Sequence, residues 1–130
     1  MRTRKVKTWE LKLKNLFDEI DVELEKLYGD QFTRHPARPA VGQTSNPEMD
    51  GLFNVGAAFS AGFGSEFGPG YVVDIRLSTL QRIPTELKEE LRDRVQVMLT
   101  EKLPEAFPGK ELHVVPEKKH LRIYGDLSLD

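Results

Sequence analysis

The most informative absence from this sequence is cysteine, which does not occur among its 130 residues. Disulfide bonds, cysteine-based zinc sites and thiol nucleophiles are therefore excluded, and a reducing compartment is favoured. No run of apolar residues approaches the roughly 20 needed to cross a bilayer, and the N-terminus lacks the apolar segment of a signal peptide. These absences predict a cytoplasmic protein without membrane contact.

The sequence also lacks an excess of one charge, since 19 Lys and Arg residues balance 21 Asp and Glu residues for a net charge of −2. This balance argues against nucleic acid as a partner. Basic residues are concentrated only near the start of the chain, where Glu10 is the acidic neighbour of Arg2, Arg4, Lys5, Lys7, Lys12 and Lys14. Because chain ends are usually poorly anchored, we predict that residues 1–6 form a flexible basic arm. The alternative is that this arm contacts phosphate or acidic lipid.

Sequence motifs for catalysis and cofactor binding are missing too. The stretch around Gly62 and Gly64 has Phe67 where the third glycine of a dinucleotide fingerprint would stand. No G-x-x-x-x-G-K-[ST] phosphate loop and no G-x-S-x-G nucleophile motif occurs. The three histidines are scattered without the spacing of a metal site. We therefore predict no metal and no cofactor, and a non-catalytic protein in preference to an enzyme.

Helical periodicity occurs in two segments of the chain. Apolar residues recur at steps of three and four from Trp9 to Leu27, which predicts an amphipathic helix that ends at Gly29. A second helix is predicted to open at Pro84 and to end or distort at Pro104. Its apolar stripe consists of Leu87, Leu91, Val95, Met98 and Leu103. Each stripe needs a sheet, another helix or a partner chain to cover it.

Residues 30–50 show neither helical nor strand periodicity. Three prolines interrupt this segment: Pro36, Pro39 and Pro47. They predict a long loop, and loops of this length tend to be functional in compact domains. The loop holds three groups able to bind an anion, Arg34, His35 and Arg38, although pairing with surface carboxylates is the simpler interpretation.

Strand periodicity dominates the remaining segments. Bulky and small residues alternate from Phe53 to Phe63, and Phe53, Phe59 and Phe63 are expected on the core side. A glycine-rich turn leads to a second alternating segment, Tyr71 to Leu77, and together they predict a hairpin. Segments 112–115 and 121–124 predict another hairpin across the turn PEKK.

The predicted elements form a single domain over residues 1–130, because a chain of this length usually builds one core. Their order is helix, strand, strand, helix, strand, strand. This order favours an α+β two-layer sandwich, with two helices on one face of a four-stranded sheet. The sheet is predicted to be mixed or antiparallel, since the second helix is long enough to join parallel neighbours.

The side of the first predicted strand opposite its bulky residues is lined by small ones. Glycine within a strand is unfavourable unless another group approaches closely. We therefore expect the long loop, a helix or a second subunit to pack on this face, and dimerisation across it is one hypothesis. The interface is assigned to Asn54, Gly56, Ala58 and Ser60.

Polar residues of the predicted strands form a second candidate site. If the aliphatic residues face the helices, the opposite face carries Asp74, Arg76, His113 and Arg122. A carboxylate beside a histidine could perform acid–base chemistry, and the candidate catalytic residues are Asp74, His113 and His35. The candidate ligands for a phosphate or carboxylate group are Arg34, Arg38, Arg76 and Arg122.

Two functional classes follow from these candidate sites. The favoured one is a non-catalytic module for protein interaction or self-association through a sheet face. The alternative is a small enzyme or binding domain for an anionic ligand. A polar sheet face occurs on any half-solvated antiparallel sheet, so the polar residues alone do not indicate catalysis.

Overall fold

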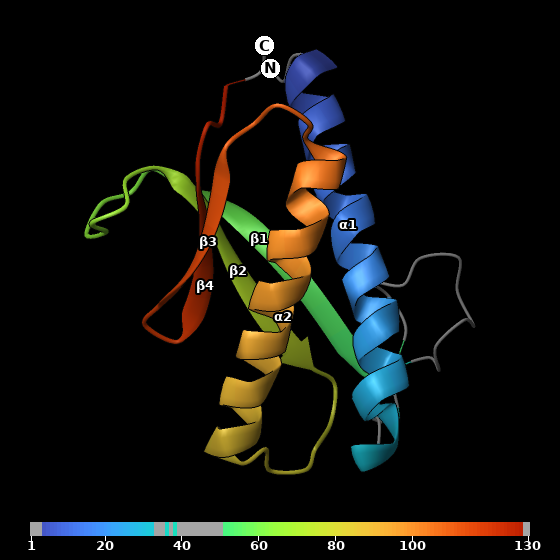
Figure 1. Ribbon diagram of the computed structural model, residues 1–130. Helices are drawn as coiled ribbons and strands as arrows, with labels where there is room; N and C mark the ends of the chain where they lie inside the picture. The colour runs from blue at the N-terminus through green and yellow to red at the C-terminus, as the bar shows by residue number, and fades with distance from the viewer. Residues whose placement is uncertain (1–3, 33–35, 37, 39–50, 129–130) are drawn as a thin grey trace.

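Two helices pack on one face of a four-stranded sheet in the computed structural model, which describes residues 4–32, 36, 38 and 51–128 (Figure 1). The elements are α1 (Arg4–Tyr28), the short 3-10 helix η1 (Gly29–Gln31), β1 (Phe53–Ser60), β2 (Gly70–Leu77), α2 (Thr85–Ala106), β3 (Leu112–Glu117) and β4 (His120–Gly125). This arrangement confirms the predicted α+β fold and the predicted order of elements.

The sheet is antiparallel throughout, with strand order β1-β2-β4-β3. Of the two predicted sheet types, mixed and antiparallel, the antiparallel one is therefore confirmed, and the strands before and after α2 are not parallel neighbours. After α2 the chain crosses to the far edge and forms β3, and the tight turn to β4 then brings β4 back beside β2. As a result, β1 and β3 are the two edge strands.

The core lies between the helices and the sheet. The predicted stripe of α1 is buried from Trp9 to Leu24, whereas Leu27 at its end is exposed. Trp9 contacts Phe107 after α2 at a ring-centroid distance of 4.1 Å. The sheet contributes alternate residues, among them Val73, Leu121 and Ile123. Burial of each large apolar side chain stabilises the fold by about 1.5–3 kcal/mol, and this term is what pairs the helices with the sheet.

The first strand is shorter than its sequence pattern predicts. It ends at Ser60 instead of continuing to Phe63, and the side chains of Phe59 and Phe63 are 63% and 96% exposed. Their assignment to the core is therefore wrong. The strand stops because Gly62 adopts a φ of +95°, and a Cβ there would collide with the backbone of Gly68 across the turn.

The first helix begins earlier than expected. Residues 4–6 belong to α1, so the predicted flexible arm can include only residues 1–3, which lie outside the described residues. The second helix continues through Pro104 to Ala106 and is preceded by Pro84 as its capping residue. No helix in the described parts of the chain is both long enough and apolar enough to cross a membrane.

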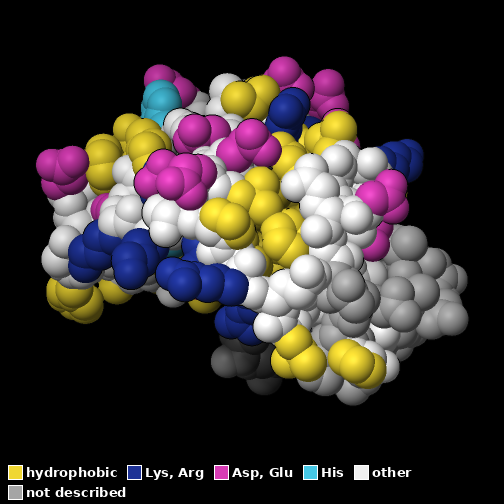
Figure 2. Space-filling model, turned by 90° about the horizontal axis from the view of Figure 1, so that it is seen from below, with side chains coloured by type: hydrophobic (Ala, Val, Ile, Leu, Met, Phe, Trp, Pro, Cys, Tyr) yellow, Lys and Arg dark blue, Asp and Glu magenta, His cyan; other side chains and the backbone are white. Residues whose placement is uncertain are grey.

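Acidic and basic side chains are both visible at the end of the molecule where α2 begins (Figure 2). Hydrophobic side chains lie between them on this face. The view agrees with the balanced composition of the chain, because neither sign of charge covers this end.

Candidate functional site

The outer edge of β1 is the first candidate site. The N–H of Ser78 donates to the carbonyl of Leu52 over 2.8 Å, and the register pairs Asn54 with Arg76 and Ala58 with Val72. In an antiparallel ladder, bonded pairs alternate along the strand, so the even-numbered residues of β1 bond to β2. The N–H and C=O groups of Ala57 and Phe59 therefore point away from the sheet.

The first half of this edge is covered by α1. The N–H of Val55 donates to Oδ1 of Asp21 over 2.7 Å, and the N–H of Leu52 donates to Oε2 of Glu25 over 3.0 Å. Both carboxylates come from α1. Asp21 satisfies an outward backbone donor that a neighbouring strand would otherwise use, so α1 blocks strand addition at Val55, and Glu25 fixes the start of β1 against α1.

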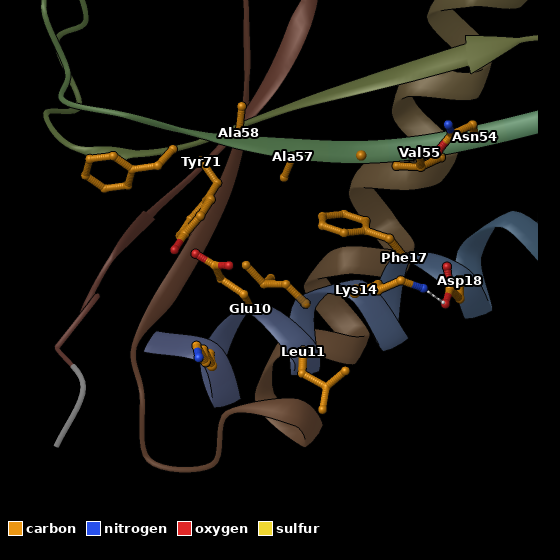
Figure 3. Close-up of a pocket in the computed structure, with 14 residues that line it drawn as sticks. Glu10, Leu11, Lys14, Phe17, Asp18, Asn54, Val55, Ala57, Ala58 and Tyr71 are labelled. Atoms are coloured by element: carbon orange, nitrogen blue, oxygen red, sulfur yellow. Dashed lines mark hydrogen bonds and ion pairs between the residues drawn. The ribbon is translucent and has the colours of Figure 1, made fainter. Parts of the chain in front are cut away.

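Beyond Val55, α1 and β1 separate and leave a groove of about 610 Å³ along the strand edge, the edge groove (Figure 3). Its lining residues are Lys7, Glu10, Leu11, Leu13, Lys14, Phe17, Asp18, Asn54, Val55, Gly56, Ala57, Ala58, Phe59 and Tyr71. The side chain of Ala57 points toward α1, and that of Ala58 points to the opposite face of the sheet (Figure 3). The small Ala57 side chain leaves the groove open at its centre.

The walls of the edge groove combine apolar surface with charges of both signs. Leu11 is 57% exposed on the helix side, and Phe59 lies edge-on to Tyr71 at 5.7 Å on the strand side. Lys14 and Asp18 form an ion pair at 2.9 Å on the helix wall. The pKa of Tyr71 is raised chiefly by burial of its hydroxyl, with a smaller contribution from the Glu10 carboxylate.

The opposite edge of the sheet, formed by β3, is covered differently. Nε2 of Gln96 on α2 donates to the carbonyl of Val114 over 3.0 Å. In the β3–β4 register, the backbone groups of Val114 and Pro116 face the outer edge of the sheet. Proline has no N–H to donate there. This edge is thus protected at its middle and at its end.

The predicted interface residues lie on the face of β1 turned away from the helices. Gly56 and Ala58 are exposed, and a Cβ built at Gly56 meets no atom within 4 Å. Ser60 is different, because its hydroxyl accepts a hydrogen bond from Arg122 over 3.3 Å. Packing within the described chain therefore does not explain the small size of residue 56, and the interface remains a prediction.

Arg122, predicted as an anion ligand, is instead buried within the protein. Its side chain is 4% exposed, and its three nitrogens contact Glu117, Gly68 and Ser60 at 2.7, 3.2 and 3.3 Å. The guanidinium thus joins the ends of β1 and β3 to the loop between β1 and β2. Those donors are engaged internally, which does not favour a role in holding a ligand.

Glu117 lies at the centre of this network. Its carboxylate accepts hydrogen bonds from Ser65 at 2.5 Å and from Arg122, and it contacts His120 at 3.2 Å. The Ser65 and Arg122 hydrogen bonds lower the pKa of Glu117 to about 2. A catalytic triad requires the histidine between the serine and the carboxylate. Here the carboxylate is in the middle, which does not activate the serine.

The remaining polar candidates are not brought together. His113 packs against Tyr124 at 5.1 Å and lies 3.6 Å from Glu111. The register aligns His113 with Tyr124 and Gly70, so Asp74 is separated from it by four positions along β2 and by the intervening strand. At about 3.3 Å per residue, this offset alone is about 13 Å. Arg76 is also on β2 and is exposed.

The loop candidates fall mostly beyond the described structure. Arg34 and His35 lie outside the described residues. Arg38 is described, and its Nε donates to the carbonyl of Gly51 over 3.1 Å. Arg38 therefore has a structural contact just before β1, and its predicted ligand role is not tested.

Sequence reasoning missed Asp21 and Glu117. Asp21 is buried on the apolar side of α1, four residues after Phe17 and three before Leu24. A carboxylate at such a position needs a donor, and this spacing was a usable signal. Glu117 gave no comparable signal, because an acid in a short turn sequence is ordinarily solvated.

Comparison with known proteins places the chain in a family. A family model described as "Uncharacterised protein" matches residues 4–125. A protein of Borreliella burgdorferi, also described as an uncharacterized protein, is 35% identical over 107 residues, which cover 82% of this chain and 84% of that protein. No solved structure matches the chain. The match covers α1 through the end of β4, and the chain belongs to this uncharacterised protein family.

Proposed function

We propose that this protein is a non-catalytic interaction module that binds an extended protein segment along the outer edge of β1. The observation that carries the proposal is the outward direction of the backbone groups of Ala57 and Phe59 beside the edge groove. An added strand would bond to those groups and place alternate side chains in the groove. Strand addition of this kind is a common mode of peptide recognition.

Among the described residues, the second half of β1 lacks the usual protection of an edge strand, and this supports the proposal. Proteins usually protect edge strands with prolines, charged side chains, bulges or covering elements. From Gly56 to Ser60, β1 contains no proline and no charged residue. An exposed Phe59 on such an edge is an aggregation hazard unless a partner covers it.

The compartment is part of the same proposal. The sequence contains no cysteine, and this composition favours a reducing compartment. We therefore assign the interaction to the cytoplasm.

A displayed library of extended peptides panned on the protein tests this function. We expect peptides that bind the wild type and lose at least about tenfold in affinity, or about 1.4 kcal/mol, on the Ala57→Pro variant. Proline at 57 removes an outward N–H and leaves the bonds between β1 and β2 in place. Phe59→Asp should weaken binding too, because it places a charge beside the groove.

Leu80→Asp is the matched control for Phe59→Asp, because Leu80 is also a large exposed apolar residue, at 79%, and follows β2 at the end of the sheet where β1 begins, at the opposite end of β1 from Phe59. It should leave peptide affinity unchanged. Peptides that bind Ala57→Pro as tightly as wild type, or that depend on Leu80 instead, would contradict strand addition at β1.

A further inference from the structure

Resting on the proposed function of the β1 edge, we infer that its occupant is a second copy of this chain. The two β1 strands would pair antiparallel about a two-fold axis at Ala58, which joins the two sheets into one. An isologous pairing of this kind uses the same surface on both copies, so a single edge strand is sufficient.

Charge favours β1 itself as the added strand. The α1 wall of the edge groove carries two basic residues, Lys7 and Lys14, and two acidic residues, Glu10 and Asp18, and Lys14 forms an ion pair with Asp18. A charge-balanced groove gives no advantage to a strongly basic or acidic segment. The strand Phe53–Ser60 has no charged residue and therefore pairs there without an unbalanced charge.

The backbone contacts of β1 select one register. Bonded pairs between the two copies must come from outward-facing residues, and the N–H of Val55 is already taken by Asp21. Centring the pair on Gly56 or Ala57 would require that N–H. Centring it on Phe59 would require Ala61, which lies beyond the strand. With Ala58 at the centre, Ala57 of each copy pairs with Phe59 of the other. These two symmetric pairs form about four backbone hydrogen bonds.

The same register matches large side chains with small ones. Phe59 of one copy lies opposite Ala57 of the other, on the helix side, where the small Ala57 leaves the groove open. On the other face, Ala58 meets its own copy and Gly56 meets Ser60. These small residues allow close approach of the two strands, which agrees with the interface predicted from sequence.

The pair closes at two chains. At the β3 edge, Gln96 caps the Val114 carbonyl and Pro116 offers no N–H, which disfavours addition of a third copy there. A strand contact about 20 Å long buries less than the roughly 800 Å² per partner of a standard interface. The dimer should therefore be weak, with a Kd between about 1 μM and 1 mM.

Single-cysteine cross-linking tests this register in a chain that has no other cysteine. The two Ala58 residues form a non-bonded antiparallel pair with Cα atoms about 4.5 Å apart, within the range of a disulfide. Ala58→Cys should therefore form a disulfide-linked dimer under mild oxidation. Gly56→Cys is the control, because its two copies would be about 13 Å apart.

Adding Phe59→Asp to Ala58→Cys should slow cross-linking at least tenfold. Sedimentation of the wild type should show dimer increasing with concentration, and Ala57→Pro should remain monomeric. Two results would overturn the inference that a second copy occupies the β1 edge. One is faster cross-linking of Gly56→Cys than of Ala58→Cys, and the other is a wild-type protein that stays monomeric up to about 1 mM. Peptide binding that still depends on Ala57 would then show that the edge serves another protein, whereas loss of both results contradicts the proposed function as well.

Discussion

The two edges of the sheet differ in how their backbone groups are satisfied. Along β3, a helix side chain caps Val114 in the middle and Pro116 removes a donor near the end. Along β1, α1 caps only the beginning, through Asp21 and Glu25, and the second half faces the edge groove. Equivalent positions in the fold thus have opposite properties, because α1 diverges from its strand and leaves a gap where α2 supplies a cap.

The largest expected effect comes from removing the residue that joins the two edges. Arg122 contacts Ser60 at the end of β1 and Glu117 at the end of β3, and it is nearly fully buried. Arg122→Ala should destabilise the protein by about 3 kcal/mol, since it leaves buried polar groups without their partner. Urea unfolding measures this loss.

Proteolysis of the loop between β1 and β2 supplies a second measurement for Arg122→Ala. Arg122 bonds to Gly68 in this loop, so cleavage should accelerate more than global unfolding explains. Unchanged stability would show that the network around Arg122 does not hold the two edges together.

A smaller effect is expected from opening the protected half of β1. Asp21→Ala leaves the N–H of Val55 without its acceptor, at a cost of about 1–3 kcal/mol in unfolding free energy. Asp21→Asn keeps an acceptor and should lose less. If both variants are equally destabilised, the carboxylate charge and not the cap is responsible, and the contrast between the two halves of β1 weakens.

The corresponding change at the other edge should cost less. Gln96→Ala removes the donor to Val114, and a carbonyl at a partly exposed edge can turn to water, so we expect at most about 1 kcal/mol. Chemical denaturation measures the unfolding free energy of this variant and of Thr100→Ala, an exposed position one turn further along α2. The difference between them separates the loss of the hydrogen bond to Val114 from the general effect of an alanine substitution on α2. A loss of unfolding free energy larger than that of Asp21→Ala would show that the cap on β3 contributes more to stability than the cap on β1.

The smallest effect concerns pH. The pKa of Glu117 lies near 2 in the folded protein, below its ordinary value of 4.5, mainly because Ser65 and Arg122 bond to the carboxylate. A depressed pKa stabilises the fold fully above about pH 4.5, and this contribution is lost as the pH falls toward 2. The melting temperature of Glu117→Gln should therefore fall less between pH 4.5 and 2 than that of the wild type. If the melting temperatures of the variant and the wild type fall in parallel, Glu117 does not cause the loss of stability at low pH.

The sequence predicted the elements better than it predicted the site. Apolar periodicity located α1 and α2, and alternation located all four strands, because each pattern is set by neighbouring residues. The same alternation placed Phe59 and Phe63 in the core wrongly, since it cannot show where a strand leaves the helix that covers it. The small residues on β1 singled out this strand, yet they did not show that its second half lines a groove beside α1.

The sequence by itself therefore determined which segments are helices and strands and which side of each is apolar. These properties depend on spacing over a few residues and on the hydrophobic effect. Only the tertiary structure decided that β4 lies beside β2, that β1 is an edge strand, and that Arg122 is enclosed between Ser60 and Glu117. Strand order and buried polar contacts join residues far apart in the chain, so no local pattern specifies which groups remain free to bind a partner.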